Sequence, residues 1–188
     1  MNNRLLNLMV AVGLCLAFTT GCCNQPATTS VSSSWKDELK TEIPLLGHRN
    51  WIVVTDMAYP LQTAPGIRTI YTDASYMDIL SYVYGEIEKA PHIKAHVYQD
   101  KEFLSLDEQM APGTDLLRQQ MKALFGNEIK PVPHEELIAR LDEVSRMFHV
   151  VILKSTLTTP YTTAFFELDC NYWDSTREEA LQKKVNQQ

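Results

Sequence analysis

Four polar side chains lie at or beside the strand ends where an open α/β sheet would hold a ligand. His48 precedes the apolar segment 51–55 and Asp56 closes it, while His134 lies in the first turn of a predicted helix and Tyr161 lies between the last two predicted strands. Ligands of such sheets bind beyond the carboxyl ends of the strands. A histidine exchanges protons near neutral pH, because its unperturbed pKa is about 6.5. The four residue types together are suited to proton transfer on a polar ligand.

Each of these residues also has an interpretation without chemistry. His48 follows Gly47 and could finish a helix with its ring in water, and Asp56 could be a turn residue. His134 could be an exposed residue at a helix start, and Tyr161 could pack its ring under a loop. No single one of the four is specific.

Other catalytic patterns are weak or missing. His92 and His96 would share a strand face, but neither a cysteine nor a carboxylate nearby completes a metal-binding set. The sequence has no glycine-rich phosphate loop, no HExxH and no GxSxG. We therefore expect neither a metal nor a cofactor.

The hydrophobic pattern predicts the elements that position these residues. Apolar spacing and turn residues indicate helices over 34–47, from Thr72 or Asp73 through Ile87, over 116–125 and from Pro133 through Phe148. Strands are expected over 51–55, 67–71, 93–98, 128–132, 150–153 and 164–168. Strands that alternate with helices predict an α/β fold, a three-layer α/β/α domain with a mostly parallel or mixed central sheet.

Composition limits the class of protein. The chain has 188 residues, 45% of them hydrophobic and 21% charged, which suits one soluble domain. A formal charge of -6 argues against nucleic acid as a partner. We assign the folded domain to 35–174 and a polar tail to 175–188, which is either a frayed surface helix or disordered.

The first residues are typical of a secretory signal. Arg4 is followed by a mostly apolar stretch over 5–18 and then by Gly21-Cys22. A small residue before cysteine is where bacterial lipoproteins are cut and lipidated, although Thr19 replaces their usual leucine. We expect a signal peptide over 1–21, lipidation of Cys22, a flexible tether over 22–34 and attachment to the bacterial cell envelope, periplasm-facing or at the cell surface. The alternative is an ordinary signal cut nearby.

Three segments, taken in order, resemble the ribose pyranase / fucose mutarotase (RbsD/FucU) family. Leu46-Gly47-His48 followed by Thr55-Asp56 and Pro60 is similar to the family's Leu-Gly-His … Asp … Pro opening. Val132-Pro133-His134-Glu135-Glu136 is similar to a Thr-His-Glu segment of the ribose branch. The stretch 151–155 with Pro160-Tyr161-Thr162-Thr163 is similar to the closing strand, loop and Tyr-x-Asn. The resemblance spans roughly Trp35 to Trp173.

The resemblance implies an RbsD-like fold and an isomerase that interconverts anomeric or ring forms of a ribose- or fucose-like monosaccharide without a cofactor. It also implies a ring-like homo-oligomer, decameric in the family, with sites between subunits. His48 matches the family's proton donor, and Asp56, His134, Tyr161 and Thr163 match positions that line the sugar site. Opening a hemiacetal needs one proton delivered and one removed, and such acid–base help contributes roughly 10²–10⁴-fold.

Two positions depart from the family pattern. Thr156-Leu157 replaces the family's Gly-Glu, and Thr163 replaces the asparagine of Tyr-x-Asn. A site built around polar partners discriminates strongly when one of them changes. Two alternatives therefore stand beside the enzyme: a non-catalytic monosaccharide-binding lipoprotein on the same scaffold, and an envelope assembly protein with a vestigial pocket.

Overall fold

A computed structural model describes residues 34–187 of the chain. The predicted signal peptide, the lipidated Cys22 and all of the predicted tether except Ser34 lie outside the described residues. Within 34–187 we find no helix that combines the length and the apolar character needed to cross a membrane.

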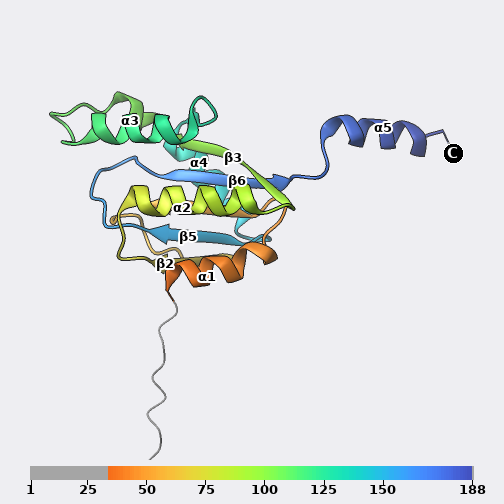
Figure 1. Cartoon of the computed structure of the whole chain (residues 1–188), viewed down its shortest axis with the longest axis horizontal. Helices are drawn as coiled ribbons and strands as arrows, with labels where there is room; N and C mark the ends of the chain where they lie inside the picture. The colour runs from red at the N-terminus through yellow and green to blue at the C-terminus, as the bar shows by residue number, and fades with distance from the viewer. Residues whose placement is uncertain (1–33, 188) are drawn as a thin grey trace, which may run out of the picture. The chain divides into compact units, whose positions relative to one another are not determined.

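A six-stranded mixed sheet forms the centre of the fold (Figure 1). Its order is β2-β5-β1-β6-β3-β4, and β6 runs antiparallel to both of its neighbours while the other neighbouring pairs are parallel. The strands are β1 (Trp51–Thr55), β2 (Ile67–Tyr71), β3 (Ile93–Asp100), β4 (Lys130–Val132), β5 (Val150–Lys154) and β6 (Ala164–Cys170). The carboxyl ends of the five parallel strands therefore meet the amino end of β6 at one edge.

Helices cover both faces of this sheet. Three of them, α1 (Trp35–Glu42), α2 (Tyr76–Lys89) and α3 (Thr114–Phe125), contribute to the larger hydrophobic core, and α2 lies across the face turned to the viewer in Figure 1. Only α4 (His134–Val144) among the described helices contributes to the smaller core on the opposite face. The three-layer α/β/α arrangement predicted from the sequence is confirmed.

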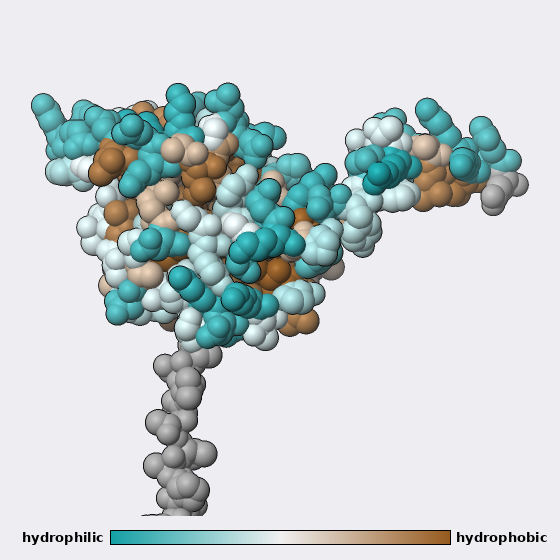
Figure 2. All heavy atoms as spheres, viewed as in Figure 1, coloured by the Kyte–Doolittle hydropathy of each residue, from teal (hydrophilic) through white to brown (hydrophobic). Residues whose placement is uncertain are grey.

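Alternation along the buried strands divides the side chains between the two cores. In β1, Ile52 and Val54 join the larger core, while Trp51 and Val53 join the smaller one. Every residue of β1 is buried, as expected for a strand covered on both faces. On the surface, hydrophobic residues are exposed in separate areas among hydrophilic ones on the face shown in Figure 2.

Several element boundaries differ from the prediction. The first α-helix ends at Glu42 and continues as the 3₁₀ turn η1 (Ile43–Leu45), because a proline at position 44 cannot continue the α-helical hydrogen bonds. The second helix starts at Tyr76, because Asp73 adopts a left-handed φ of 51° and Ser75 caps the helix.

The boundaries of the later elements also differ from those predicted. Residues 128 and 129 do not belong to β4, and a second 3₁₀ turn, η2 (Lys101–Ser105), follows β3. The tail forms helix α5 (Ser175–Val185), the first of the two expected alternatives, and each of its residues is exposed. Strand β3 continues to Asp100, two residues beyond the prediction, and this extension adds a carboxylate to the site described next.

Candidate functional site

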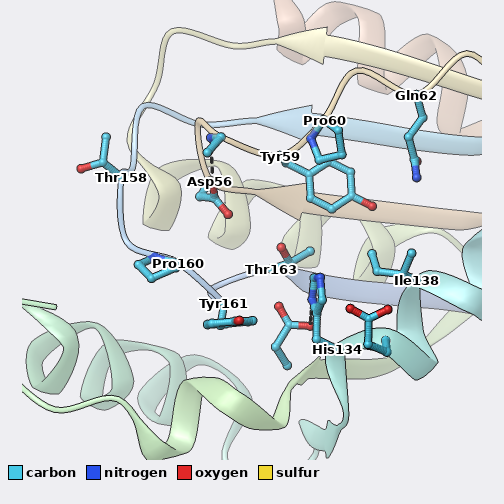
Figure 3. Close-up of a pocket in the computed structure, with 13 residues that line it drawn as sticks. Asp56, Tyr59, Pro60, Gln62, His134, Ile138, Thr158, Pro160, Tyr161 and Thr163 are labelled. Carbon is cyan, nitrogen blue, oxygen red and sulfur yellow. Dashed lines mark hydrogen bonds and ion pairs between the residues drawn. The ribbon is translucent and has the colours of Figure 1, made fainter. Parts of the chain in front are cut away.

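A cavity of about 360 Å³ opens at the carboxyl ends of β1 and β3 (Figure 3). This volume is in the range of small-molecule sites, roughly 300–1,000 Å³. The end of β1 and the loop after it, the end of β3, the start of α4 and the β5–β6 loop all contribute. The lining residues are Asp56, Ala58, Tyr59, Pro60, Gln62, Asp100, His134, Glu135, Ile138, Thr158, Pro160, Tyr161 and Thr163.

Asp56 is held at the cavity by the turn that follows β1. One carboxylate oxygen, Oδ1, accepts a hydrogen bond of 2.7 Å from the backbone N–H of Ala58. Only 9% of Asp56 is exposed, and Figure 3 shows its carboxylate directed into the cavity. A buried carboxylate fixed in this way can accept hydrogen bonds from ligand hydroxyls.

His134 begins α4 and is held by two carboxylates. Both oxygens of Glu102 accept from its backbone N–H, at 3.2 and 3.0 Å. Its ring atom Nδ1 lies 3.0 Å from Oδ1 of Asp100. The Tyr161 ring meets the imidazole edge-on, with ring centroids 5.5 Å apart. The ring is therefore fixed in position within the cavity wall.

Asp100, at the end of β3, was not predicted as a site residue. It is fully buried, and its Oδ2 has no hydrogen-bond partner among the described residues. Burial raises the pKa of Asp100 from 3.8 to about 6, against the lowering by the hydrogen bond and charge of His134, and nearby Glu102 and Asp56 add to the increase. The rule that selected Asp56, a carboxylate that closes a strand, selects Asp100 once β3 is extended by two residues.

The β5–β6 loop presents Tyr161 and Thr163. Tyr161 has a left-handed φ of 56°, which is uncommon for a residue other than glycine. Thr162 stabilises this conformation, because its carbonyl accepts from the Tyr76 hydroxyl and its hydroxyl donates to the Thr159 carbonyl at 3.0 Å. Thr163 is 1% exposed, whereas Tyr161 is 40% exposed above the cavity.

Polar groups without partners and negative charge characterise the cavity. The hydroxyl of Tyr59 and Oε1 of Gln62 are buried without a hydrogen-bond partner in the part of the chain that the structure describes. Burial, followed by the charge of Asp100, raises the pKa of Tyr59 well above its usual range, so this phenol remains a donor. Three carboxylates line the cavity and no lysine or arginine does. The arrangement suits an uncharged ligand rich in hydroxyls.

His48 does not line this cavity in the same chain. It lies before the amino end of β1, and the five residues of that strand separate its ends by about 13 Å. Its Nδ1 lies 2.8 Å from Oδ1 of Asp169, in a separate cavity that Lys94 and His96 also line. The structure thus brings Asp56, His134, Tyr161 and Thr163 together and places His48 elsewhere.

Thr156-Leu157, which replaces the Gly-Glu of the family pattern, does not line this cavity. Leu157 packs against the larger core and lines another cavity, beside α2 and α3. The Thr156 hydroxyl donates to the carbonyl of Ala74 at 3.1 Å. Of the two departures from the family pattern, only Thr163 stands in the site.

His92 and His96, which share β3, have different partners in the structure. Nε2 of His92 lies 3.2 and 3.1 Å from the carbonyls of Ile43 and Leu46, whereas His96 lies beside Asp169. No group of three metal-binding side chains occurs among these residues. Cys170 is a half-buried free thiol, and Cys23 lies outside the described range.

Solved structures that are similar to this chain were found, although no family model and no curated protein matches it. RbsD from Bacillus subtilis, solved in complex with D-ribose, has a TM-score of 0.51 and 17% identity, covering 70% of this chain and 91% of its own. The fucose mutarotase of Streptococcus pneumoniae, in complex with L-fucose, has a TM-score of 0.47 and 18% identity over 71% and 91% of the two chains. FucU from Bifidobacterium longum has a TM-score of 0.46 and 11% identity over 70% and 93%.

The similarity to RbsD is one of fold. The six-stranded mixed sheet and the five α-helices of residues 34–187 form an RbsD-like α/β domain.

Proposed function

We propose that the chain is a monosaccharide mutarotase or pyranase. The observation that carries the proposal is one cavity in which Asp56, His134, Tyr161 and Thr163 meet, the four sugar-site positions implied by the sequence resemblance. The RbsD-like fold and the buried, unpaired polar atoms of Tyr59 and Gln62 support a ligand with many hydroxyl groups.

The charge of the cavity favours a free sugar over a sugar phosphate. Its lining includes Asp56, Asp100 and Glu135 and no cationic side chain. Lys154, on neighbouring β5, donates to the carbonyl of Tyr59 at 2.5 Å. A phosphate would therefore face carboxylates without a paired lysine or arginine. A ribose- or fucose-like monosaccharide is the substrate class that fits.

His48 enters this proposal from a second copy of the chain. Its side chain is 58% exposed, and Asp169 accepts from its ring at 2.8 Å. Burial raises the pKa of Asp169, but the Cys170 N–H, His48 and Lys94 lower it below the usual value overall, so this carboxylate stays ionised. We assign His48 as the acid that reaches the cavity of a neighbouring copy in a ring-like homo-oligomer.

Ring opening then proceeds by paired proton transfers. The acid protonates the ring oxygen while the anomeric hydroxyl loses its proton to a base in the cavity. Asp56 holds sugar hydroxyls, and the Tyr161 ring presents an apolar face and a hydroxyl. The open form can close on either face or onto a different hydroxyl, which gives anomer or ring-form exchange.

Saturation-transfer NMR between sugar anomers tests the activity. D-ribose and L-fucose are the first probes, each with the wild type, His48→Ala and His149→Ala, the last being a matched variant of a half-exposed histidine outside both cavities. We expect faster exchange with the wild type and His149→Ala, and a loss of roughly 10²-fold or more with His48→Ala. If the wild type leaves anomer exchange at the uncatalysed rate for every common aldose, the proposed enzymatic activity is refuted.

A second candidate is a non-catalytic monosaccharide-binding protein. Two observations favour it: Thr163 stands in the cavity where the family has an amide, and His48 lies outside the cavity of its own chain. Calorimetry that detects saccharide binding without anomer exchange would select this candidate. Absence of binding would leave only an assembly role with a vestigial pocket.

We also propose that the chain is anchored at the cell envelope through lipidated Cys22. The basis is the signal-like sequence before Gly21-Cys22. Mass spectrometry of the mature protein should find a diacylglyceryl-modified residue at its new amino terminus. An unmodified terminus elsewhere would indicate an ordinary signal cut.

A further inference from the structure

A carboxylate and an imidazole form a pair inside the cavity wall. Asp100 is fully buried at the end of β3, and its Oδ1 lies 3.0 Å from Nδ1 of His134. Glu102 holds the backbone N–H of the same histidine. The two carboxylates therefore have separate tasks: Glu102 fixes the start of α4, and Asp100 contacts the ring.

This contact decides which ring nitrogen of His134 carries hydrogen. A neutral imidazole has one N–H and one bare nitrogen, and an ionised carboxylate can only accept. Nδ1 must therefore carry the hydrogen that Asp100 accepts, which leaves Nε2 bare on the side of the ring away from Asp100. Because His134 lines the cavity, its bare nitrogen is available to a ligand there.

We propose that Asp100 is a positioning residue that fixes His134 as the general base for the anomeric hydroxyl. This inference rests on the proposed function and completes it, because ring opening needs a base in addition to the acid assigned to His48. Asp100 acts through His134 and does not itself take the sugar proton.

The proton transfers balance as follows. Nε2 of His134 takes the proton of the anomeric hydroxyl, and the electron pair of that O–H bond forms the carbonyl at C1. The bond from C1 to the ring oxygen breaks, and its electron pair takes a proton from the imidazolium of His48 of a second copy. Asp100 stabilises the imidazolium formed at His134, and the reverse transfers close the ring.

The surroundings of Asp100 set the pH range in which this arrangement holds. It faces the ring of His134, the carboxylates of Glu102 and Asp56, and the hydroxyls of Tyr59 and Tyr76. Because burial raises the pKa of Asp100 to about 6, its carboxylate accepts from Nδ1 fully only above that pH. Exchange activity should therefore fall as the pH drops through about 6.

The ¹⁵N NMR pattern of the histidine rings tests the pairing without any sugar. Full-length protein labelled at histidine is measured at pH 8, and His134→Gln identifies the signals. We expect Nδ1 of His134 to be protonated in the wild type. In Asp100→Asn we expect a shift toward the Nε2–H form, because the amide N–H donates to Nδ1. An Nε2–H form in the wild type, or the same form in both proteins, overturns the proposal.

Anomer exchange of D-ribose and L-fucose supplies the kinetic test. Asp100→Asn should lower kcat roughly 10²–10⁴-fold with little change in KM and should remove the fall near pH 6. Asp142→Asn, which removes an exposed carboxylate from α4, should retain wild-type exchange and pH profile. Unchanged kcat in a folded Asp100→Asn protein overturns the proposal.

The ring spectrum and the exchange kinetics distinguish a failure of the proposed function from a failure of the proposal for Asp100. If the wild type exchanges no sugar, the proposed function fails, whereas the wild-type ring spectrum still decides whether Asp100 positions His134. If Asp100→Asn does not fold, that spectrum and the wild-type pH profile decide the question.

Discussion

The carboxylate of Asp56 contributes to both the shape and the charge of the cavity. Its Oδ1 accepts from the Ala58 N–H, and an asparagine at this position can preserve that bond while removing the negative charge. Hydrogen bonds to charged groups contribute about 1.5–3 kcal/mol. We therefore expect Asp56→Asn to weaken the binding of D-ribose or L-fucose roughly 10- to 100-fold in calorimetry.

The matched control for that variant is Asp73→Asn. Asp73 is exposed, accepts from the Tyr71 hydroxyl at 3.0 Å and has a left-handed φ that asparagine also tolerates. Its sugar affinity should equal that of the wild type. If the wild type, Asp56→Asn and Asp73→Asn bind the sugar with equal affinity, Asp56 does not contribute to sugar binding.

Asp100 should make the fold less stable as the pH rises. Well below pH 3.8 its carboxyl is protonated in both the folded and the unfolded chain. Between 3.8 and about 6 the folded state binds more protons, so the free energy of unfolding falls with increasing pH and then levels off. The full shift corresponds to about 3 kcal/mol.

Asp100→Asn removes this titration. In urea unfolding from pH 4.5 to 7.5, the variant should gain stability relative to the wild type by up to about 3 kcal/mol as the pH rises. Asp142→Asn should follow the wild-type curve. Parallel curves for Asp100→Asn and the wild type would contradict the burial of an ionised carboxylate at position 100.

The sequence identified four of the thirteen residues that line the cavity and missed its most buried one. The resemblance supplied Asp56, His134, Tyr161 and Thr163, which meet in one cavity. Asp100 was not predicted because the alternation of apolar and polar residues ends after Tyr98. Residues 99 and 100 are both polar, and both are buried in the fold. A buried polar strand end is typical of a site, but burial is a property of the fold and is invisible in single-residue types.

Among the elements, the start of β2 packs without spare room against the end of α4. A Cβ added to Gly66 would overlap the carbonyl oxygens of Ser145 and Phe148, and both are backbone atoms. The Gly66 carbonyl also accepts from the N–H of Val150 at 2.8 Å, so the turn cannot move freely away.

We expect Gly66→Ala to lower the free energy of unfolding by about 2 kcal/mol or more, as overpacking against backbone does. Gly85→Ala is the matched control, because Gly85 lies within α2 with no other atom near the added Cβ. That variant should gain roughly 0.5–1 kcal/mol. Chemical denaturation measures both, and equal stabilities would refute the tight packing of α4 against β2.

Element types were largely predictable, because the buried strands β1 and β5 are mainly apolar and the helices that cover the sheet carry apolar residues at helical spacing. The direction of the strands was not predictable in this way. The loop 155–163 contains no crossover helix, so β6 returns antiparallel, next to β1. That reversal brings Tyr161 and Thr163 to the carboxyl end of β1. Local pattern predicts a strand at 164–168, but its neighbours are set by packing among distant segments.

At the scale of the whole molecule, the implied catalytic groups occupy opposite ends of β1. Asp169 holds His48 at the amino end, while Asp100 holds His134 at the carboxyl end. A sugar in the cavity of one copy cannot contact both groups of that copy. If His48 is the acid and His134 the base, the enzyme therefore needs at least two copies, arranged so that the amino end of β1 in one copy faces the cavity of another.

Mixing inactive variants tests this arrangement. His48→Ala leaves the cavity intact and His134→Ala leaves His48 intact, and each alone should exchange D-ribose anomers slowly. In a randomly mixed ring, about a quarter of the sites combine an intact His48 with an intact cavity, so co-expression should restore about that share of activity. Co-expressed Asp100→Asn and His134→Ala, both defective in the cavity, should restore none. Complementation in neither mixture, with wild-type activity established, would mean that the acid comes from the cavity's own chain, and His48 would lose its assigned role.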